Sequence, residues 1–360
     1  MKKIKVAVLG TGFIADIHLE SYRRFVHEAE VVAIYGRNQK NAEVVAEKFG
    51  IPNAFSDIDE LLEKVDVDIV DICLPNYLHH EACMKAAEHN KHIIVEKPFA
   101  LTLEDADEMI AVCKEKNLKL MYAEELCFAP KYERVRMLVE KGAVGEVYML
   151  KQSEKHSGPH SPWFYKKETA GGGVMMDMGC HALAWFRWMT GNKKVKSVFA
   201  DMKTVLHNDI TDCDDNTVTI VEFENGVIGV AEDSWARFGG MDDRIEVYGT
   251  KGVSYADLFQ GNSALTYSTE GYDYAAEKAG STKGWTFTMF EEAFNQGYPQ
   301  ELMHFVDCVK NDKQPLVTGE DGRAVLEMIY AAYQSARTGA KVFLPFHAEV
   351  KYPIQLLLGE

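Results

Sequence analysis

The sequence predicts an α/β protein with two domains: a doubly wound parallel sheet comes first, followed by an α+β domain built on an open, largely antiparallel sheet. Over the first 122 or so residues, short apolar strands alternate with helical patterns, which is typical of right-handed β-α-β crossovers in a parallel sheet. From residue 195 to 269, short strands follow one another without helices between them. We therefore expect domains over 1–122 and 123–345, with a C-terminal tail over 346–360.

Buried parallel strands account for the apolar runs of the first domain. The first run, "IKVAVL", is apolar almost throughout, as expected for a strand covered by helices on both faces. The predicted strands are residues 4–9, 31–36, 67–74, 91–98 and 118–124. The predicted helices fall between them, through about residue 26 and over 40–49, 79–90 and 103–117.

The pattern changes in the second domain. A helix over 130–141, a strand over 145–154 and an apolar helix over 174–190 precede a series of alternating strands. The turn "ENGV" between two of these strands favours a β-hairpin. Two helices, over 299–312 and 319–338, are expected to close this domain.

Composition and charge exclude some classes of function. The 360 residues are 47% hydrophobic and 26% charged, which is the composition of a globular protein with a sizeable core. Asp and Glu number 55 against 39 Lys and Arg, which gives a net charge of −16. This charge repels nucleic acid unless basic residues gather in a patch, and the sequence shows no such patch. A nucleic-acid partner is therefore not expected.

The cellular compartment is predicted from the N-terminal pattern and the cysteines. The start, "MKKIKVAVLG", enters a strand pattern without the apolar region and cleavage site of a signal peptide, and no run of about 18 apolar residues predicts a membrane span. The seven cysteines are scattered without a C-x-x-C pair, which favours reduced, buried thiols over a disulfide frame or a zinc site. We expect a cytoplasmic protein with no membrane partner.

The segment "GTGFIA" follows the first predicted strand and opens a helix. Its glycines permit a tight turn and a close approach of the backbone to a pyrophosphate, which the helix N-terminus attracts. The pattern alone also fits any strand-to-helix turn that needs glycine, but its place at the start of an alternating β/α array indicates a dinucleotide site. The candidate cofactor-binding residues here are Gly10, Gly12, Phe13 and Ile14.

The end of the second strand bears on the choice of cofactor. NAD-binding folds carry an acid there for the ribose 2′-hydroxyl, whereas "YGRN" supplies Gly36, Arg37 and Asn38. In the absence of a carboxylate, Arg37 can pair with a 2′-phosphate. In the alternative interpretation, Arg37 stacks on the adenine or faces solvent. We expect NAD(P)(H) as cofactor, and the pattern favours NADP.

The sequence "VEKPF" places Glu96, Lys97 and Pro98 at the carboxyl end of the fourth strand, on the edge where open α/β sheets bind ligands. A lysine at this edge can hydrogen-bond a substrate hydroxyl and stabilise a developing alkoxide. It can equally be a surface lysine before a turn-forming proline. These residues by themselves do not decide between the two interpretations.

One acid and one histidine interrupt the apolar helix of "AGGGVMMDMGCHALAW". Asp177 and His181 are four residues apart and share a helix face, and their apolar neighbours imply burial. A buried carboxylate or imidazole is costly unless paired, and pairing satisfies both groups and fixes the histidine tautomer. A hydrogen-bonded pair in the core accounts for the spacing, and a catalytic pair is the alternative.

The loop "KHSGPHSPWFY" has the aromatic and polar side chains that line sugar pockets, although each residue fits a packed surface loop equally well. The candidate substrate-binding residues are His156, His160, Trp163 and Tyr165, together with Glu124 at the end of the fifth strand. The two histidines are four residues apart, as a metal pair can be, but no acid or cysteine accompanies them at a matching spacing. No metal site is therefore expected.

Four segments together resemble a known family. They are "GTGFIA", "LPNYLHHEACMKAAEHNKHIIVEKPFA" at 74–100, "KGAVGEV" at 141–147 and "GGGVMMDMGCH" at 171–181. In this order and spacing they are similar to the glucose–fructose oxidoreductase / inositol dehydrogenase / rhizopine-catabolism (Gfo/Idh/MocA) family. The resemblance covers both halves of the chain, and the combined pattern is more specific than any one segment.

The resemblance implies a Rossmann domain and an NAD(P)-dependent oxidoreductase that acts on a sugar, polyol or glycoside. It implies that the catalytic set, which also contacts substrate, is Lys97, Asp177 and His181. It implies further cofactor-lining residues, which are Leu74, Pro75, Asn76, His79, Glu96 and Lys97. Gly36 departs from the acid of many NAD-using relatives. The open sheet usually forms the subunit interface in such proteins, so a homodimer or homotetramer is expected.

In the mechanism that this resemblance implies, His181 accepts the hydroxyl proton while hydride leaves the adjacent carbon. Asp177 orients His181 and stabilises its charged form, much as the buried acid does in a serine-protease triad. The glycines before the helix let the chain approach the substrate. Two alternatives remain: a redox-neutral glycosidase with tightly bound NAD, and a non-catalytic dinucleotide-binding regulator. Retention of the whole catalytic set argues against a regulator, which needs no proton acceptor.

Overall fold

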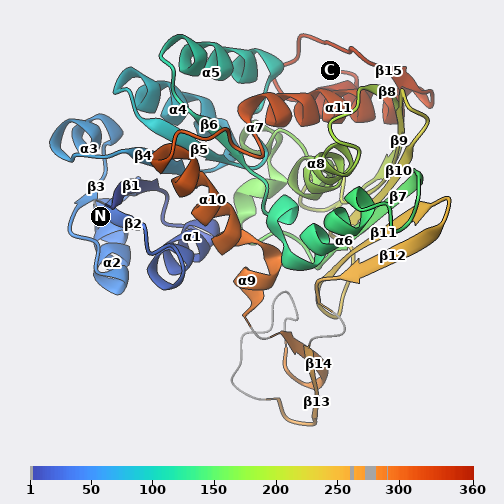
Figure 1. The fold of residues 1–360 in the computed structure, drawn as a ribbon, viewed down its shortest axis with the longest axis horizontal. Coiled ribbons are helices and arrows are strands. Elements are labelled where there is room, and N and C mark those ends of the chain that lie inside the picture. The colour runs from blue at the N-terminus through green and yellow to red at the C-terminus, as the bar shows by residue number, and fades with distance from the viewer. Residues whose placement is uncertain (1–2, 260–262, 272–280, 290) are drawn as a thin grey trace. The chain divides into compact units, whose positions relative to one another are not determined.

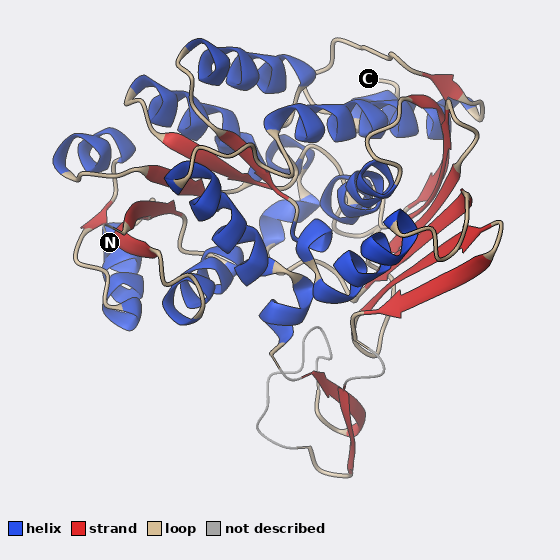
Figure 2. Ribbon diagram, viewed as in Figure 1, coloured by secondary structure: helices blue, strands red, loops and turns tan. Residues whose placement is uncertain are grey.

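A computed structural model of the protein describes residues 3–259, 263–271, 281–289 and 291–360. The chain divides into two compact units. The first unit comprises Met1–Phe128 and Gly297–Leu326, and the second comprises Ala129–Gln296 and Glu327–Glu360. The main element of each unit is a sheet covered by helices, seen as red strands and blue helices in Figure 2.

The first unit contains a six-stranded parallel sheet with the strand order β3-β2-β1-β4-β5-β6. Its strands are β1 (Ile4–Leu9), β2 (Ala29–Tyr35), β3 (Ala54–Phe55), β4 (Ile69–Ile72), β5 (His92–Glu96) and β6 (Leu120–Ala123). The predicted doubly wound sheet is confirmed, and β3 adds a sixth strand to the five that the sequence predicts. The strand order reverses between β1 and β4, and in such sheets ligands bind outside the carboxyl ends of the strands at this switch point.

Helices cover both faces of this sheet (Figure 1). They are α1 (Phe13–Arg24), α2 (Gln39–Phe49), α3 (Ile58–Lys64), α4 (His79–Glu88) and α5 (Leu103–Glu115), with short 3-10 turns η1 (Asn76–Leu78) and η2 (Glu125–Phe128). Side-chain caps account for several helix starts. For example, the Thr102 hydroxyl accepts a hydrogen bond from the Asp105 N–H at 3.0 Å, satisfying a donor that the first turn of α5 leaves unpaired.

Helix α10 (Tyr298–Lys310) packs within the first unit, whereas the sequence places it with the second domain. The physical reason is its apolar face. Phe305 is fully buried and meets Phe128 edge to face at 5.8 Å, and the ring of Tyr298 lies 6.1 Å from that of His18 in α1. The following helix, α11 (Gly319–Thr338), contributes residues to both units.

The second unit contains a seven-stranded sheet with the strand order β12-β11-β7-β10-β9-β8-β15. Its strands are β7 (Val147–Lys155), β8 (Val195–Lys203), β9 (Asn216–Phe223), β10 (Ile228–Ser234), β11 (Asp242–Gly249), β12 (Gly252–Asp257) and β15 (Val342–Phe343). All neighbours are antiparallel except β7 and β10, so the predicted open, largely antiparallel sheet is confirmed. The "ENGV" hairpin joins β9 to β10, and Gly226 at its turn has a φ of +85°.

The remaining elements of the second unit are mostly short helices. They are α6 (Pro130–Glu140), η3 (Pro162–Tyr165), α7 (Lys167–Ala170), η4 (Met175–Gly179), α8 (Cys180–Met189), α9 (Glu292–Gln296) and α12 (Gln355–Leu358), beside a two-stranded sheet of β13 (Ser263–Ser268) and β14 (Gly284–Met289). Helix α8 packs directly on β10. The contact is so close that a Cβ atom at Gly229 of β10 would lie 2.6 Å from the ring of Phe186 in α8. No helix within the described ranges is long and apolar enough to cross a membrane.

Candidate active site

The loop between β1 and α1 has the geometry of a pyrophosphate site. Gly10 has a φ of +137°, and a Cβ atom there would lie 2.2 Å from the carbonyl oxygen of Cys73, so this position requires glycine. Gly12 is the N-cap of α1, and apart from its own immediate chain neighbours no described residue has an atom within 4 Å of the position a Cβ would take. The helix N-terminus therefore begins beside open space, which fits a bound phosphate. Phe13 and Ile14 form the first turn of this helix.

Gly36 stands at the end of β2, where an acid would bind the ribose of NAD. A Cβ atom at Gly36 would lie 2.7 Å from Cγ2 of Thr11, so a longer side chain there would require the Thr11 side chain to move. Arg37 is exposed and makes no ion pair within the described part of the chain. Asn38 caps α2: its side-chain oxygen accepts hydrogen bonds from two backbone N–H groups of the first turn, at 3.0 and 3.3 Å. That oxygen is therefore already used within the protein.

His79 connects the segment after β4 to the segment after β5. Its ring is fully buried, with Nε2 2.8 Å from the carbonyl oxygen of Leu74 and Nδ1 3.0 Å from that of Pro98. Burial lowers the pKa of His79, so near neutral pH the ring donates to one carbonyl at a time. The ring thus supports two loops at the ligand edge of the sheet. Pro75 and the buried Asn76 lie in the first of these loops.

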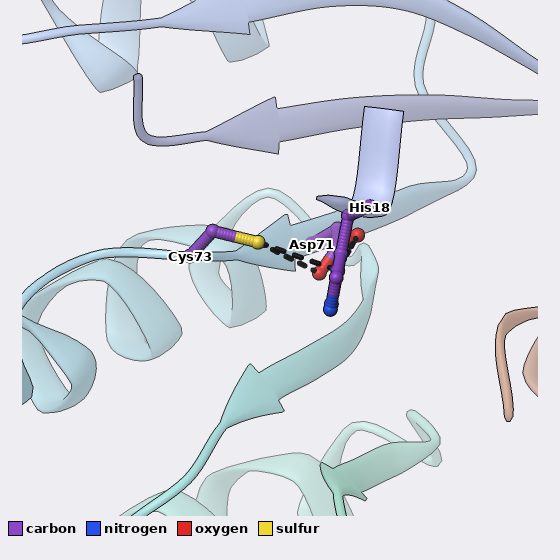
Figure 3. A group of neighbouring side chains, drawn as sticks. All are labelled: His18, Asp71 and Cys73. Carbon is purple, nitrogen blue, oxygen red and sulfur yellow. Dashed lines mark hydrogen bonds and ion pairs between the residues drawn. The ribbon is translucent and has the colours of Figure 1, made fainter. Parts of the chain in front are cut away.

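A buried group of charges, the His18 cluster, lies beside the E-K-P segment and consists of His18, Asp71 and Glu96. The ring of His18 is fully buried, with Nδ1 2.9 Å from Oδ2 of Asp71 and Nε2 3.0 Å from Oε1 of Glu96. Figure 3 shows His18 with Asp71 and Cys73. Burial alone lowers the pKa of His18, but the adjacent carboxylate of Asp71 raises it well above its ordinary value on balance. We infer an imidazolium held between two carboxylates.

The His18 cluster extends to the proposed catalytic lysine. Burial alone raises the pKa of Glu96, but His18 and then Lys97 lower it on balance, so this carboxyl group is ionised. Oε2 of Glu96 accepts a hydrogen bond from the backbone N–H of Lys97 at 3.0 Å. The direction of the chain at Lys97 therefore depends on a carboxylate that His18 holds.

The same region contains the donor types of a metal site. His18, Asp71 and Cys73 offer donor atoms within 4.8 Å of one another. Burial raises the pKa of the Cys73 thiol, and a protonated thiol is a poor metal ligand. Because His18 Nδ1 already pairs with Asp71, we interpret the group as an ion-paired cluster.

Glu124, at the end of β6, is fully buried and accepts a hydrogen bond from the hydroxyl of Tyr122 at 3.4 Å.

In the second unit, the glycine run at 171–173 packs against the protein itself. A Cβ atom at Gly172 would lie 2.0 Å from the hydroxyl of Tyr333, and one at Gly173 would lie 1.8 Å from the carbonyl oxygen of Asp214. From the sequence, these glycines were expected to let the chain approach a substrate. At Gly172 and Gly173 the missing side chain instead makes room for Tyr333 and Asp214 of the protein itself. Their small size is required by neighbours that lie far away in the sequence.

Asp214 anchors the start of η4. Its fully buried carboxylate accepts hydrogen bonds from the N–H groups of Gly173 at 3.0 Å and Met175 at 2.8 Å, and from the hydroxyl of Tyr333 at 3.0 Å. Burial raises the pKa of Asp214, although these three donors oppose the shift. The carboxylate performs the capping that a side chain at the helix start would otherwise provide.

Asp177 and His181 lie at the junction between a π-helical turn and an α-helix. Asp177 is in η4 and His181 is in the first turn of α8, and the two residues are only 6% and 2% exposed. Oδ2 of Asp177 accepts a hydrogen bond from the indole N–H of Trp235 at 3.0 Å. The helix predicted over 174–190 therefore begins as a π turn, a feature that occurs frequently at functional sites.

A second buried acid, Asp233 of β10, lies close enough to His181 for their charges to interact, and it was missed by sequence reasoning. Both of its carboxylate oxygens are buried without a hydrogen-bond partner among the residues that the structure describes. Burial raises the pKa of Asp233 well above its ordinary value, and the charge of His181 opposes this shift. Oδ2 of Asp233 lies 3.6 Å from the position of a Cβ at Gly179 in η4. The acid therefore faces the π turn.

The residues of the predicted sugar loop have two kinds of surroundings: one end pairs through its backbone, and the other end lies among aromatic side chains. His156 is buried and its N–H donates to the carbonyl of Ser234 at 2.9 Å, whereas His160 is exposed. Trp163 stacks on Phe164, with ring centroids 3.8 Å apart. The ring of Tyr165 meets Trp235 edge to face at 5.7 Å, which brings the loop to the residue that holds Asp177.

The fold and these sites together define a class of protein, the dinucleotide-dependent oxidoreductases. Residues 4–124 match the model of the Gfo/Idh/MocA oxidoreductases with an NAD-binding Rossmann fold, and residues 132–254 match the model of the Gfo/Idh/MocA C-terminal domain. The chain therefore belongs to the Gfo/Idh/MocA family, and it is an NAD(P)-dependent oxidoreductase.

Characterised relatives cover nearly the whole chain. Myo-inositol 2-dehydrogenase of Thermotoga maritima is 29% identical over 92% of this chain and 96% of its own length. D-glucoside 3-dehydrogenase of Escherichia coli is 27% identical over 95% of this chain and 97% of its own length. Among solved structures, GenD2 from gentamicin A biosynthesis in complex with NAD is similar, with a TM-score of 0.90, 29% identity and coverage of 96% of this chain and 97% of that one.

Proposed function

We propose that the protein transfers a hydride between a secondary alcohol of a sugar, polyol or glycoside and the nicotinamide of NAD(P). The observation that carries the proposal is the hydrogen bond from Trp235 to Asp177, because it fixes an acid within the buried π-to-α junction that also contains His181. The relatives named above, which act on an inositol and on D-glucosides, support this class of substrate.

The proposed mechanism assigns one role to each member of the catalytic set. A dinucleotide held at the glycine loop would supply the hydride acceptor, so that the alcohol would become a ketone with release of one proton. His181 accepts the hydroxyl proton as general base, and Asp177 orients the imidazole and stabilises its charged form. Lys97 donates a hydrogen bond to the reacting oxygen. Glu96 fixes the backbone at Lys97, and Trp235 fixes Asp177.

The glycine loop is the proposed site of the pyrophosphate, with Gly10 and Gly12 admitting the backbone to close contact. We further propose that the enzyme prefers NADP to NAD. Two observations support the preference: Gly36 leaves the end of β2 without an acid for the ribose, and the neighbouring Arg37 is an exposed cation. Replacement Arg37→Ala should then weaken binding of NADPH by about tenfold or more while leaving NADH binding unchanged, as expected for one hydrogen bond to a charged group.

A homodimer or homotetramer is proposed from the outer face of the second unit's sheet. Along β9 the inward Thr217 and Thr219 are buried, while the alternating Val218 and Ile220 are exposed on the other face. Tyr255 on β12 is likewise 62% exposed. A second copy of this chain covering the same face would bury these side chains. Light scattering after chromatography should give a multiple of 40.5 kDa, and Ile220→Lys should shift it toward the monomer.

Two measurements test the proposed reaction. The ultraviolet spectrum of freshly purified protein, with analysis of released nucleotide, shows whether a dinucleotide stays bound. Absorbance at about 340 nm is then followed with NAD or NADP and a panel of inositols, sugars and methyl glycosides. We expect the protein to take up dinucleotide reversibly and to reduce NAD or NADP only when a substrate is present. Nucleotide that survives purification, with glycoside cleavage that needs no added cofactor, would instead support a redox-neutral glycosidase.

A further inference from the structure

Trp235 connects the proposed catalytic acid to two other side chains of the second unit. Its indole N–H donates to Asp177, while its rings meet Tyr165 edge to face at 5.7 Å and His207 edge to face at 6.5 Å. The rings of Tyr165 and His207 are themselves 5.4 Å apart. Tyr165 and His207 are therefore separated from Asp177 by a single indole.

His207 is held in one orientation by Asp215. Nδ1 of His207 lies 2.9 Å from Oδ2 of Asp215, a side chain with no exposed surface. The same carboxylate accepts hydrogen bonds from the backbone N–H groups of residues 205, 206 and 207, at 2.6, 2.8 and 3.0 Å, so the loop itself is fixed around it. In the neutral ring, Nδ1 then carries the proton and Nε2 is a hydrogen-bond acceptor.

Two polar atoms converge beside Gly158. A Cβ atom at this glycine, whose φ is +86°, would lie 2.9 Å from the hydroxyl oxygen of Tyr165 and 3.6 Å from Nε2 of His207. Neither of these atoms has a hydrogen-bond partner in the part of the chain that the structure describes. Burial, with a contribution from Asp215, raises the pKa of Tyr165, so the phenol keeps its proton. One donor and one acceptor therefore lie near the same point beside Gly158.

We propose that Tyr165 and His207, meeting over Gly158, form a binding subsite for a second hydroxyl group of the substrate, away from the carbon that is oxidised. The hydroxyl donates to Nε2 of His207 and accepts from the hydroxyl of Tyr165. A deoxy carbon can do neither, and a methyl ether lacks the donor. The subsite thus selects neutral polyhydroxylated ligands with a free hydroxyl at one position. The inference rests on the proposed function, because it names the part of a sugar-type substrate that this enzyme recognises.

The test measures binding instead of turnover. Calorimetric titration of the enzyme–NADPH and enzyme–NADH complexes uses myo-inositol, methyl β-D-glucopyranoside and the set of single deoxy analogues of each. We call the tighter-binding of these two full compounds the parent. One of its deoxy analogues should bind about tenfold more weakly than the parent, the loss expected when hydrogen bonds are not made. His207→Phe should weaken binding of the parent by a similar factor and leave binding of that one analogue unchanged. This coupling separates recognition of a hydroxyl from a general structural effect.

Further variants keep the test decisive if His207→Phe is unstable. Tyr165→Phe removes only the hydroxyl and should give the same coupling, Gly158→Ala should weaken the parent by filling the subsite, and His207→Gln should recover part of the affinity. Asn208→Ala, at the exposed neighbour in the same loop, is the matched control and should bind as the wild type does.

Equal weakening of the parent and of every analogue in both phenylalanine variants would overturn the subsite. A wild-type protein that binds none of these probes would overturn it together with the proposed function. Tight, coupled binding without oxidation of any probe would contradict the proposed function alone and support the subsite.

Discussion

The acids of the His18 cluster in the first unit and Asp214 in the second unit are held in different ways. In the first unit, Asp71 and Glu96 pair with a positive charge on His18, and all three side chains are removed from water. In the second unit, Asp214 accepts hydrogen bonds from uncharged donors, which are two backbone N–H groups and a tyrosine hydroxyl, and Asp177 accepts one from an indole N–H. Each arrangement positions a residue of the proposed catalytic set.

The difference has a physical consequence. A buried ion pair is sensitive to loss of either partner, because the remaining charge is left without compensation. A carboxylate held by several dipoles loses only one hydrogen bond when one donor is removed. We therefore expect the His18 cluster to respond to changes of charge, and the surroundings of Asp214 to respond to changes of shape.

The largest effect on stability should come from breaking the His18 cluster. Replacement Asp71→Ala leaves the imidazolium of His18 without its closer partner and should lower the free energy of unfolding by about 3–5 kcal/mol. Chemical denaturation followed by circular dichroism measures the change. The control is Asp66→Ala, which removes an exposed partner of Lys5 and should leave stability close to that of the wild type. Similar losses in both variants would contradict the charge-based account.

A smaller loss is expected from crowding in the second unit. A methyl group at Gly173 would overlap the backbone of Asp214, so Gly173→Ala should destabilise the protein by about 1–3 kcal/mol. Gly12→Ala is the matched control because its methyl group enters open space. That variant should keep the melting temperature and weaken dinucleotide binding instead. Loss of dinucleotide binding in Gly173→Ala without loss of stability would reverse the roles assigned to the two glycines.

Loss of the hydrogen bond to Asp177 should have a comparable effect on stability. Trp235→Phe keeps an aromatic ring and removes the N–H, which should lower the free energy of unfolding by about 1–3 kcal/mol because a buried carboxylate loses a donor. The pH profile of turnover should shift as well, since Asp177 is proposed to stabilise the charged form of His181. Trp188→Phe, at a partly buried tryptophan of α8, is the control. An unchanged pH profile in Trp235→Phe would separate Asp177 from catalysis.

The smallest effect should be a difference in pH dependence between the units. The raised pKa of His18 means that its stabilising proton is fully present below about pH 6.5 and is lost as pH rises through the raised, folded-state value. Between about pH 7 and 9, amides of β5 should lose protection against hydrogen exchange relative to amides of β9, after correction for the intrinsic rates. His18→Gln should remove the difference. Parallel changes in both strands would show that His18 does not act as proposed.

Most of the fold is predicted from the sequence because its signals are local. The apolar run "IKVAVL" needs no partner to be recognised, and neither does the "ENGV" turn. The exceptions have physical reasons. β3 has two residues, too few to form a pattern, and the π turn at Met175–Gly179 has the same apolar composition as an α-helix.

The partners of the site residues could not be predicted from the sequence, because they depend on tertiary contacts. The sequence separates Trp235 from Asp177 by 58 residues and His18 from Asp71 by 53, and no spacing rule connects them. The glycine run illustrates the same limit: its pattern shows that small residues are needed, but not that Asp214 and Tyr333 are the neighbours that require them. The sequence therefore indicates the motif residues as candidates but does not indicate the residues that hold them.

The most direct test of the central claim compares the wild type with His181→Ala. Binding of NADPH and NADH is titrated by fluorescence, and hydride transfer is followed as a single turnover at about 340 nm with the best substrate of the panel. The account predicts unchanged dinucleotide binding and hydride transfer slowed by about 10² to 10⁴, the usual contribution of a general base. Hydride transfer at nearly the wild-type rate would contradict the assignment of His181 as the proton acceptor.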